Sequence, residues 1–158
     1  ISETPLLETA RDVNTSMPAH TVERLEAKLE EYGTELSDGS VLVLGLTYRP
    51  GVAELRYAPA IDVIELLRDL GAEVYAHDPL IDPETIAEFG AISVSDPTDA
   101  QGIGGIVLAT GHEQYADLDL EALRETLDTP VFIDGRAFFD SGQLSSFDYT
   151  AIGKPDRA

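Results

Sequence analysis

The segment 41–60 constrains the fold more than any other part of this chain. An apolar run rich in valine and leucine ends at Gly45, a long loop carrying Arg49 and Arg56 follows, and Pro59 then opens an amphipathic helix. In an α/β protein such a segment places its loop at the carboxyl edge of the sheet, where ligands usually bind. Guanidinium groups offer paired, planar donors that match phosphate oxygens, so the segment favours a phosphate-bearing ligand.

From residue 41 onward the chain alternates between strand-like and helix-like patterns. The expected elements are strands over 41–46, 73–77, 91–94, 103–109, 131–134 and 147–152, and helices over 60–70, 83–89 and 121–127. Continuous apolar runs indicate strands that are buried on both faces, as in a parallel sheet covered by helices. We therefore predict an α/β fold with a doubly wound, mainly parallel Rossmann-like sheet of five to six strands.

A long helix is expected to precede the sheet, over residues 5–32. Its apolar residues recur at intervals of three to five, and Pro5 suits the first position of a helix. Pro18 removes a backbone donor, so a kink or a break between two helices is expected there. Gly33 is typical of the residue that follows a helix.

The composition excludes several classes of function. A formal net charge of −20 on 158 residues argues against nucleic-acid binding, which requires clustered lysine and arginine. Cysteine is absent and the three histidines are scattered, so no thiol chemistry and no metal site are expected. No apolar run reaches the roughly 20 residues that span a bilayer, and no signal peptide is visible. We expect a cytoplasmic protein without a membrane partner, and the missing initial Met suggests a fragment.

The acidic residues are spread along the whole chain, whereas lysine is almost absent. Only Lys28 and Lys154 represent lysine, against eight arginines. Dispersed acid with little lysine resembles the surface of proteins from salt-rich cytoplasm, where salt screens like charges. The alternative is a merely acidic protein from an ordinary environment.

The loop after the first strand is long for a connection between a strand and a helix. It spans about a dozen residues, against the usual two to six, and such excess length tends to be functional. The glycines of a dinucleotide fingerprint are missing after Gly45, so side chains such as Arg49 and Arg56 would have to bind a diphosphate. Alternatively, both arginines are solvated and pair with neighbouring carboxylates. Tyr48 either packs in the core or lines the site.

Other polar residues follow the later strands. Asp134-Gly135-Arg136 adds a third cation at the same sheet edge. Asp78, after the second strand, is interpreted as a structural cap rather than a cofactor ligand, because the glycine fingerprint is missing. The cluster Thr110-Gly111-His112-Glu113 is interpreted as a turn at the start of a helix, since no nucleophile lies nearby for acid–base chemistry.

In this order, the motifs resemble the C-terminal domain of the UDP-glucose/GDP-mannose dehydrogenase family. The family's first-strand motif, Gly-Leu-(Ala/Ser)-(Phe/Tyr)-Lys-Pro followed by an acid, Arg and Pro, is similar to Gly45 through Ala60. The similarity continues in residues 71–79, 109–115 and 134–136, and residues 6–18 resemble the family's central helix. The resemblance divides the chain into a central or dimerisation helix region, residues 1–36, and a Rossmann-like nucleotide-sugar-binding domain, residues 37–158.

The resemblance implies an enzyme that oxidises the C6 hydroxyl of a nucleotide sugar to a carboxylate in two NAD-dependent steps. Tyr48 and Arg49 would contact the substrate, and Arg136 would hold the nucleotide-sugar. Arg56 would reach the NAD, which is bound mainly by another domain. The substrate would be a UDP-sugar or GDP-mannose, and the full-length protein would form a homodimer through the central helix.

The sequence departs from the family pattern at several positions. Arg49 stands where lysine is typical, and Ala53 and Ala58 replace an acid and a serine. The NAD fingerprint and the cysteine nucleophile belong to the family's N-terminal portion and are absent here, so this chain should hold no catalytic residue and be inactive alone. The alternative function is a non-catalytic nucleotide-binding or dimerisation module that reuses the fold.

Overall fold

The computed structural model describes residues 5–153, and for residues 10–14 it describes the backbone alone. Helices and strands alternate from residue 40 onward, and short 3-10 helices are labelled η. In chain order the elements are α1 (Pro5–Glu31), η1 (Leu36–Asp38), β1 (Ser40–Leu44), α2 (Pro59–Asp69), β2 (Glu73–His77), α3 (Pro83–Glu88), β3 (Ile92–Ser93), η2 (Pro97–Asp99), β4 (Ile103–Leu108), η3 (Glu113–Asp117), α4 (Leu120–Glu125), β5 (Leu127–Asp134) and β6 (Asp148–Ala151).

The described strands form one six-stranded sheet in the order β3-β2-β1-β4-β5-β6, and every pair is parallel. This order confirms the predicted doubly wound Rossmann-like sheet. The strand order reverses between β1 and β4, where Val41 pairs with both Val74 and Gly105. In such sheets ligands bind outside the carboxyl ends of the strands at this switch point.

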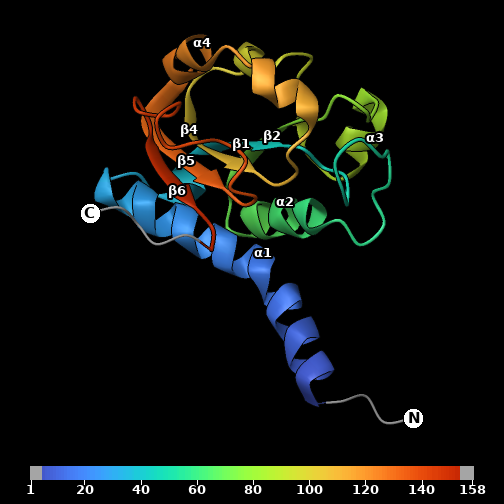
Figure 1. Ribbon diagram of the computed structural model, residues 1–158. Helices are drawn as coiled ribbons and strands as arrows, with labels where there is room; N and C mark the ends of the chain where they lie inside the picture. Colours follow the sequence, from blue (N-terminus) through green and yellow to red (C-terminus); the bar gives the residue numbers. More distant parts are fainter. Residues whose placement is uncertain (1–4, 154–158) are drawn as a thin grey trace.

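Each face of the sheet carries its own apolar core, as expected when every strand is buried on both sides. One core joins α1, α2 and α3 to the sheet, with Leu25, Ile64 and Ile86 among its buried residues. The other packs α4 and η3 against the opposite face, with Leu123 and Tyr115 buried there. Figure 1 shows α1 and α2 on one side of the sheet and α4 on the other.

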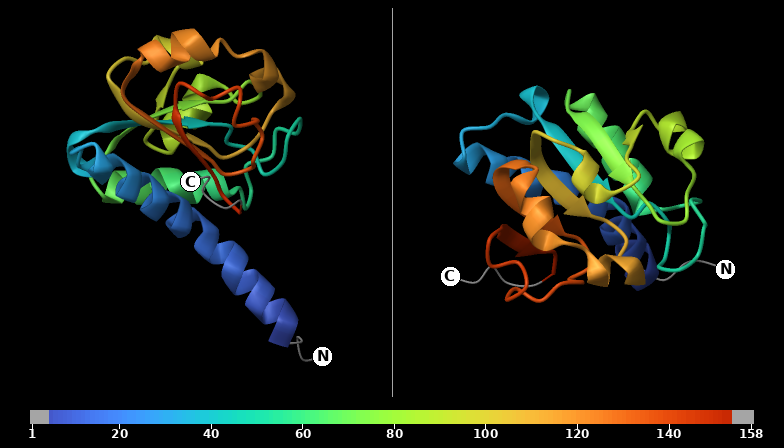
Figure 2. Two further views of the ribbon diagram at one scale, coloured as in Figure 1. Left: turned by 60° about the vertical axis from the view of Figure 1, so that its left-hand side comes forward. Right: turned by 90° about the horizontal axis from the view of Figure 1, so that it is seen from above.

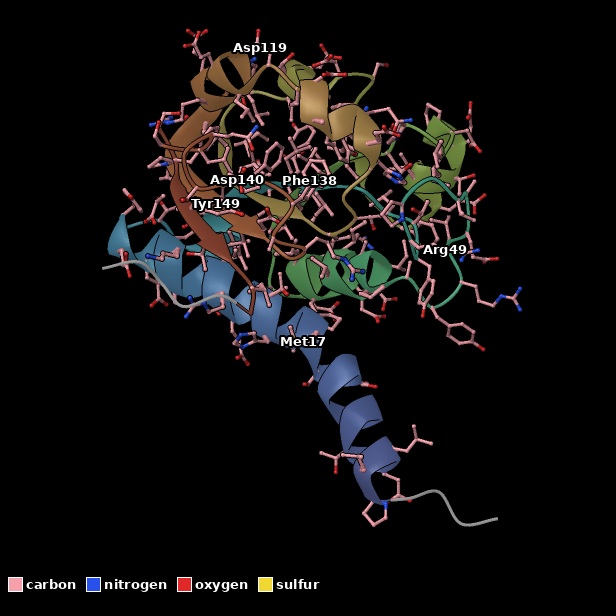
Figure 3. The ribbon with its side chains drawn as sticks, viewed as in Figure 1. Met17, Arg49, Asp119, Phe138, Asp140 and Tyr149 are labelled. Atoms are coloured by element: carbon pink, nitrogen blue, oxygen red, sulfur yellow. The ribbon has the colours of Figure 1, made fainter. Side chains whose placement is uncertain are left out.

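Helix α1 is continuous, so of the two outcomes expected at Pro18, a kink or a break, the break is not observed. Figures 1 and 2 show the helix change direction, and Figure 3 labels Met17 near this bend, as expected where proline removes a backbone hydrogen bond. Only the part after the bend packs on the sheet, while the first turns project outward and leave Leu6 80% exposed. Among the described residues, no helix is both long enough and apolar enough to cross a membrane.

The end of α1 is held against the far edge of the sheet. The Tyr32 hydroxyl donates to the Asp148 carboxylate at 3.1 Å, and Lys28 Nζ lies 3.4 Å from the same carboxylate. Because Asp148 begins β6, these two contacts join the end of α1 to the last strand of the sheet.

Strand β5 begins four residues earlier than predicted, at Leu127 rather than at 131. Pro130 lies within the strand, although proline cannot donate to a neighbouring strand. In the structure β6 pairs with β5 only from Val131 onward, so Pro130 lies outside that pairing and is tolerated.

Candidate functional site

A cavity of about 630 Å³ lies at the carboxyl ends of β4 and β5, beside α1 and the start of α2. Its position agrees with the ligand site expected for this sheet order. The side chains come from distant stretches of the chain, and the lining residues are Thr15, Met17, Pro18, Thr21, Tyr48, Tyr57, Pro59, Asp62, Val63, Val107, Leu108, Ala109, Gly135 and Arg136.

Gly45 lets the chain turn sharply out of β1. Its φ of +79° is in the left-handed region, and a Cβ placed there would lie 2.1 Å from the main-chain oxygen of Thr110. No other residue fits such an approach without moving the backbone. The Thr110 hydroxyl also donates to the Thr47 main-chain oxygen at 2.5 Å, so the segments after β1 and β4 are joined next to the cavity.

A buried carboxylate shapes the turn that carries Arg136. Asp134 ends β5 and accepts hydrogen bonds from the backbone N–H groups of Arg136 and Phe139, at 2.9 and 3.0 Å. The Tyr149 hydroxyl donates to the same carboxylate at 2.7 Å, and burial together with Asp134 raises the pKa of Tyr149. Figure 3 labels Tyr149 and Phe138 on the two segments that meet here.

The Arg136 side chain is held at the cavity by the end of β4. Its Nε donates to the main-chain oxygen of Ala109 at 2.9 Å. This bond uses one of the five N–H donors of the guanidinium and leaves the terminal nitrogens for another acceptor. The structure thus places one predicted site residue, Arg136, in the cavity.

Tyr48, another predicted site residue, lines the cavity and is 52% exposed, so it is not core packing. Tyr57 also lines it, is 87% exposed and has a φ of +61°. A bulky residue with positive φ is uncommon and costs conformational energy, and such residues often mark functional positions. Sequence reasoning did not select Tyr57.

Arg49 and Arg56 do not line this cavity, so the expected convergence of three guanidinium groups on one cavity is not observed within this chain. Both side chains are exposed on the loop after β1, where Figure 3 labels Arg49. Arg56 Nε lies 3.8 Å from the Glu54 carboxylate, which is the pairing foreseen by the alternative interpretation. The ligand-contacting roles of both arginines remain predictions.

Helix α1 lines the cavity through Met17, Pro18 and Thr21, although the sequence had suggested a scaffold or dimerisation role for it. The Thr21 hydroxyl donates back to the Met17 main-chain oxygen at 2.9 Å. The signal that could have indicated this contact was the change of pattern around Pro18, because a bend there turns the helix toward the sheet edge.

Asp78 is buried and acts as a structural cap. Its carboxylate accepts from the backbone N–H groups of Leu46 at 2.6 Å and Leu80 at 2.8 Å. The fully buried His112 lies beside it, with Nε2 2.9 Å from the carboxylate and 3.1 Å from the Thr47 hydroxyl. This network ties the ends of β1 and β2 to the turn after β4.

A second cavity, of about 520 Å³, lies on the α4 side near His77 and Tyr115. The His77 Nδ1 is 3.0 Å from the Tyr115 oxygen, and the Tyr115 hydroxyl donates to the His77 main-chain oxygen. Burial lowers the pKa of His77 and raises that of Tyr115. The described residues contain no group of three or more His, Asp or Glu able to hold a metal ion.

The turn after β1 does not fit the diphosphate of a dinucleotide. The space beside Gly45 is filled by the Thr110 backbone, and α2 starts only at Pro59. The first turn of α2 also carries Asp62, whose negative charge lines the cavity and opposes an anion at that helix end. The residues present therefore do not form a dinucleotide site of the glycine-rich type.

Together, the strand order and the arginine held at the sheet edge define a Rossmann-like domain with a cavity at the carboxyl edge of its sheet. Residues 42–141 match the model of the UDP-glucose/GDP-mannose dehydrogenase family, UDP binding domain. The chain belongs to this family.

Curated relatives agree with this assignment. The chain is 31% identical to UDP-glucose 6-dehydrogenase TuaD of Bacillus subtilis, over 95% of the chain and 33% of the relative. It is 33% identical to UDP-glucose 6-dehydrogenase AglM of Haloferax volcanii, over 85% of the chain and 30% of the relative. The chain thus spans about a third of the length of these relatives.

The fold agrees with solved structures of similar proteins. A UDP-D-ManNAc dehydrogenase from Pyrococcus horikoshii superimposes with a TM-score of 0.82 at 26% identity, covering 96% of this chain and 34% of that one.

Proposed function

We propose that this chain is the UDP-binding part of an NAD-dependent nucleotide-sugar 6-dehydrogenase, which oxidises the C6 hydroxyl of its substrate to a carboxylate. The observation that carries the proposal is Arg136, which Asp134 and Ala109 hold at the cavity. The match of residues 42–141 to the family's UDP binding domain supports the same substrate class.

In this proposal the free nitrogens of Arg136 bind the diphosphate of the nucleotide sugar. A bidentate contact between guanidinium and phosphate is short and charge-assisted, and it fixes orientation as well as adding affinity. Tyr48 closes the same cavity and contacts the substrate.

Arg49 and Arg56 act at the exposed face of the loop after β1. Arg49 contacts the substrate from the rim, and Arg56 reaches an NAD that is bound mainly by another part of the protein. The poor fit of this chain's own β1 turn to a dinucleotide supports that division. When bound, NAD would supply the hydride acceptor, and this chain alone would be inactive.

The projecting part of α1 belongs to the proposed central helix, residues 1–36, through which the full-length protein forms a homodimer. The exposed apolar side chains of Leu6 and Leu7 support an interaction there. We further propose that residues 37–158 bind the nucleotide sugar, that the protein is cytoplasmic, and that neither nucleic acid nor membrane is a partner. The charge of −20 supports the absence of a nucleic-acid partner.

A titration and an assay test the proposal together. Isothermal titration of UDP into this chain should show saturable binding. The longest natural protein that contains the sequence should form NADH from one member of a panel comprising UDP-glucose, UDP-N-acetylhexosamines and GDP-mannose. UDP binding without NADH formation would favour the alternative, a non-catalytic nucleotide-binding module. Absence of both would overturn the proposal.

A further inference from the structure

The tip of the loop between β1 and α2, residues 49–53, is exposed and weakly attached. Two backbone hydrogen bonds near it, from Tyr48 to Glu54 and from Glu54 to Val52, stay within the loop. Among the described residues, the buried Thr47 hydroxyl donates to the main-chain oxygen of Arg49 at 2.9 Å. A second hydrogen bond joins the tip to a distant part of the chain, from the Gly51 N–H to Nδ1 of His112, at 3.2 Å.

This bond fixes the state of the His112 ring. A backbone N–H can donate only to a nitrogen that carries no proton, so Nδ1 is the acceptor and Nε2 holds the proton. The Nε2–H faces the Asp78 carboxylate at 2.9 Å and the Thr47 hydroxyl oxygen at 3.1 Å. Because Asp78 is itself held by backbone N–H groups, the ring has a single orientation.

The two ring nitrogens therefore face different partners. Nε2 joins the buried network at the ends of β1 and β2, whereas Nδ1 holds an exposed loop. That loop carries Tyr48, which lines the cavity, and Arg49. A histidine that only filled the core would not need an acceptor aimed at the loop.

We propose that His112 is a positioning residue for nucleotide binding. Its Nδ1 latches Gly51, and the latched loop keeps Tyr48 at the rim of the cavity with Arg49 beside it. The inference rests on the proposed function, because it requires a nucleotide in that cavity. His112 itself touches no ligand.

Two conservative variants separate the two nitrogens. The amide oxygen of asparagine can occupy the position of Nδ1, and the amide nitrogen of glutamine can occupy that of Nε2. His112→Gln removes the latch, so its affinity for UDP should fall about three- to tenfold, the effect of one hydrogen bond. His112→Asn restores the acceptor for Gly51 and should retain most of the affinity. His112→Asn should melt at a lower temperature than wild type, because it leaves the buried Asp78 carboxylate without its ring N–H donor. His112→Gln should melt closer to wild type, because the Gly51 N–H that it frees is exposed and can donate to water.

Amide hydrogen exchange gives a readout that a purely structural role would not produce. The Gly51 N–H should exchange slowly in wild type and in His112→Asn, and fast in His112→Gln. Equal losses of affinity in both variants, or none in His112→Gln, would overturn the proposal.

Nitrogen NMR of wild type provides a test that needs no variant. The ring of His112 should show a protonated Nε2 and an unprotonated Nδ1, and a proton on Nδ1 would overturn the latch. If wild type binds no UDP, the proposed function fails, whereas the NMR and exchange results still decide whether His112 holds the loop.

Discussion

The Nε of Arg136 donates to the main-chain oxygen of Ala109 at 2.9 Å, which ties the turn after β5 to the end of β4. The guanidinium is therefore oriented before any ligand arrives. A group held in place beforehand loses less conformational entropy on binding than a free side chain does.

Arg136→Ala should weaken UDP binding by about 10- to 100-fold. The loss corresponds to about 1.5–3 kcal/mol for a hydrogen bond to a charged group. Arg136→Lys keeps the charge but loses the planar fork, so its affinity should lie between those of wild type and Arg136→Ala. Isothermal titration measures each value. Arg68→Ala is the matched control, because Arg68 donates to the Phe89 main-chain oxygen and neither residue lines the cavity. The affinity of this variant for UDP should equal that of wild type.

Gly45→Ala should destabilise the domain by about 3 kcal/mol, since a left-handed backbone and a steric overlap act together. Gly33 is the matched control: its φ is +71°, but a Cβ there would meet nothing within 4 Å. Gly33→Ala should therefore cost only about 1 kcal/mol. Urea unfolding of both variants measures the difference. Equal losses of stability in Gly45→Ala and Gly33→Ala would contradict the prediction, because the overlap with Thr110 would then add no cost.

Burial lowers the pKa of His77 below its usual value of about 6.5. Between the lowered pKa of His77 in the folded chain and its ordinary pKa in the unfolded chain, the unfolded chain binds more protons. The free energy of unfolding therefore rises with pH in this range. The stabilisation that comes from burying neutral His77 should therefore be lost progressively as the pH falls below about 6.5. Urea unfolding between about pH 5 and 7.5 should show a steeper pH dependence for wild type than for His77→Asn. Parallel curves for the two proteins would contradict this assignment.

The domain should need molar salt to stay folded. At a net charge of −20, repulsion between carboxylates opposes the compact state. Raising KCl from about 0.1 to 1 M shortens the screening length from about 10 to 3 Å, so the melting temperature should rise markedly. Differential scanning calorimetry measures it. A melting temperature indifferent to salt would instead support an ordinary acidic protein.

Most of the sheet could be predicted from the sequence, because its central strands are continuous apolar runs bounded by glycine or by Asp-Pro. Strand β2 was predicted with its observed bounds, Glu73–His77. Boundaries were less accurate where tertiary pairing extends a strand beyond its apolar run, as at the start of β5, where Leu127 pairs with Ile103.

The site was predicted only in part. Arg136 lines the cavity because it closely follows β5, whose carboxyl end faces the cavity, whereas Tyr48 reaches it from the loop after β1. Arg49 and Arg56 lie on a long loop, whose path depends on contacts with distant residues rather than on strand direction. The most important of these contacts, from Gly51 to His112, spans 61 positions and has no local sequence signal.

Helix α1 belongs both to the cavity wall and to the arm that projects from the domain. Met17 lies near the bend of the helix (Figure 3) and also lines the cavity, so the cavity wall and the arm meet there. A protein that bound the distal turns near Leu6 would therefore bind the same continuous helix that lines the cavity, with no flexible linker between the two surfaces.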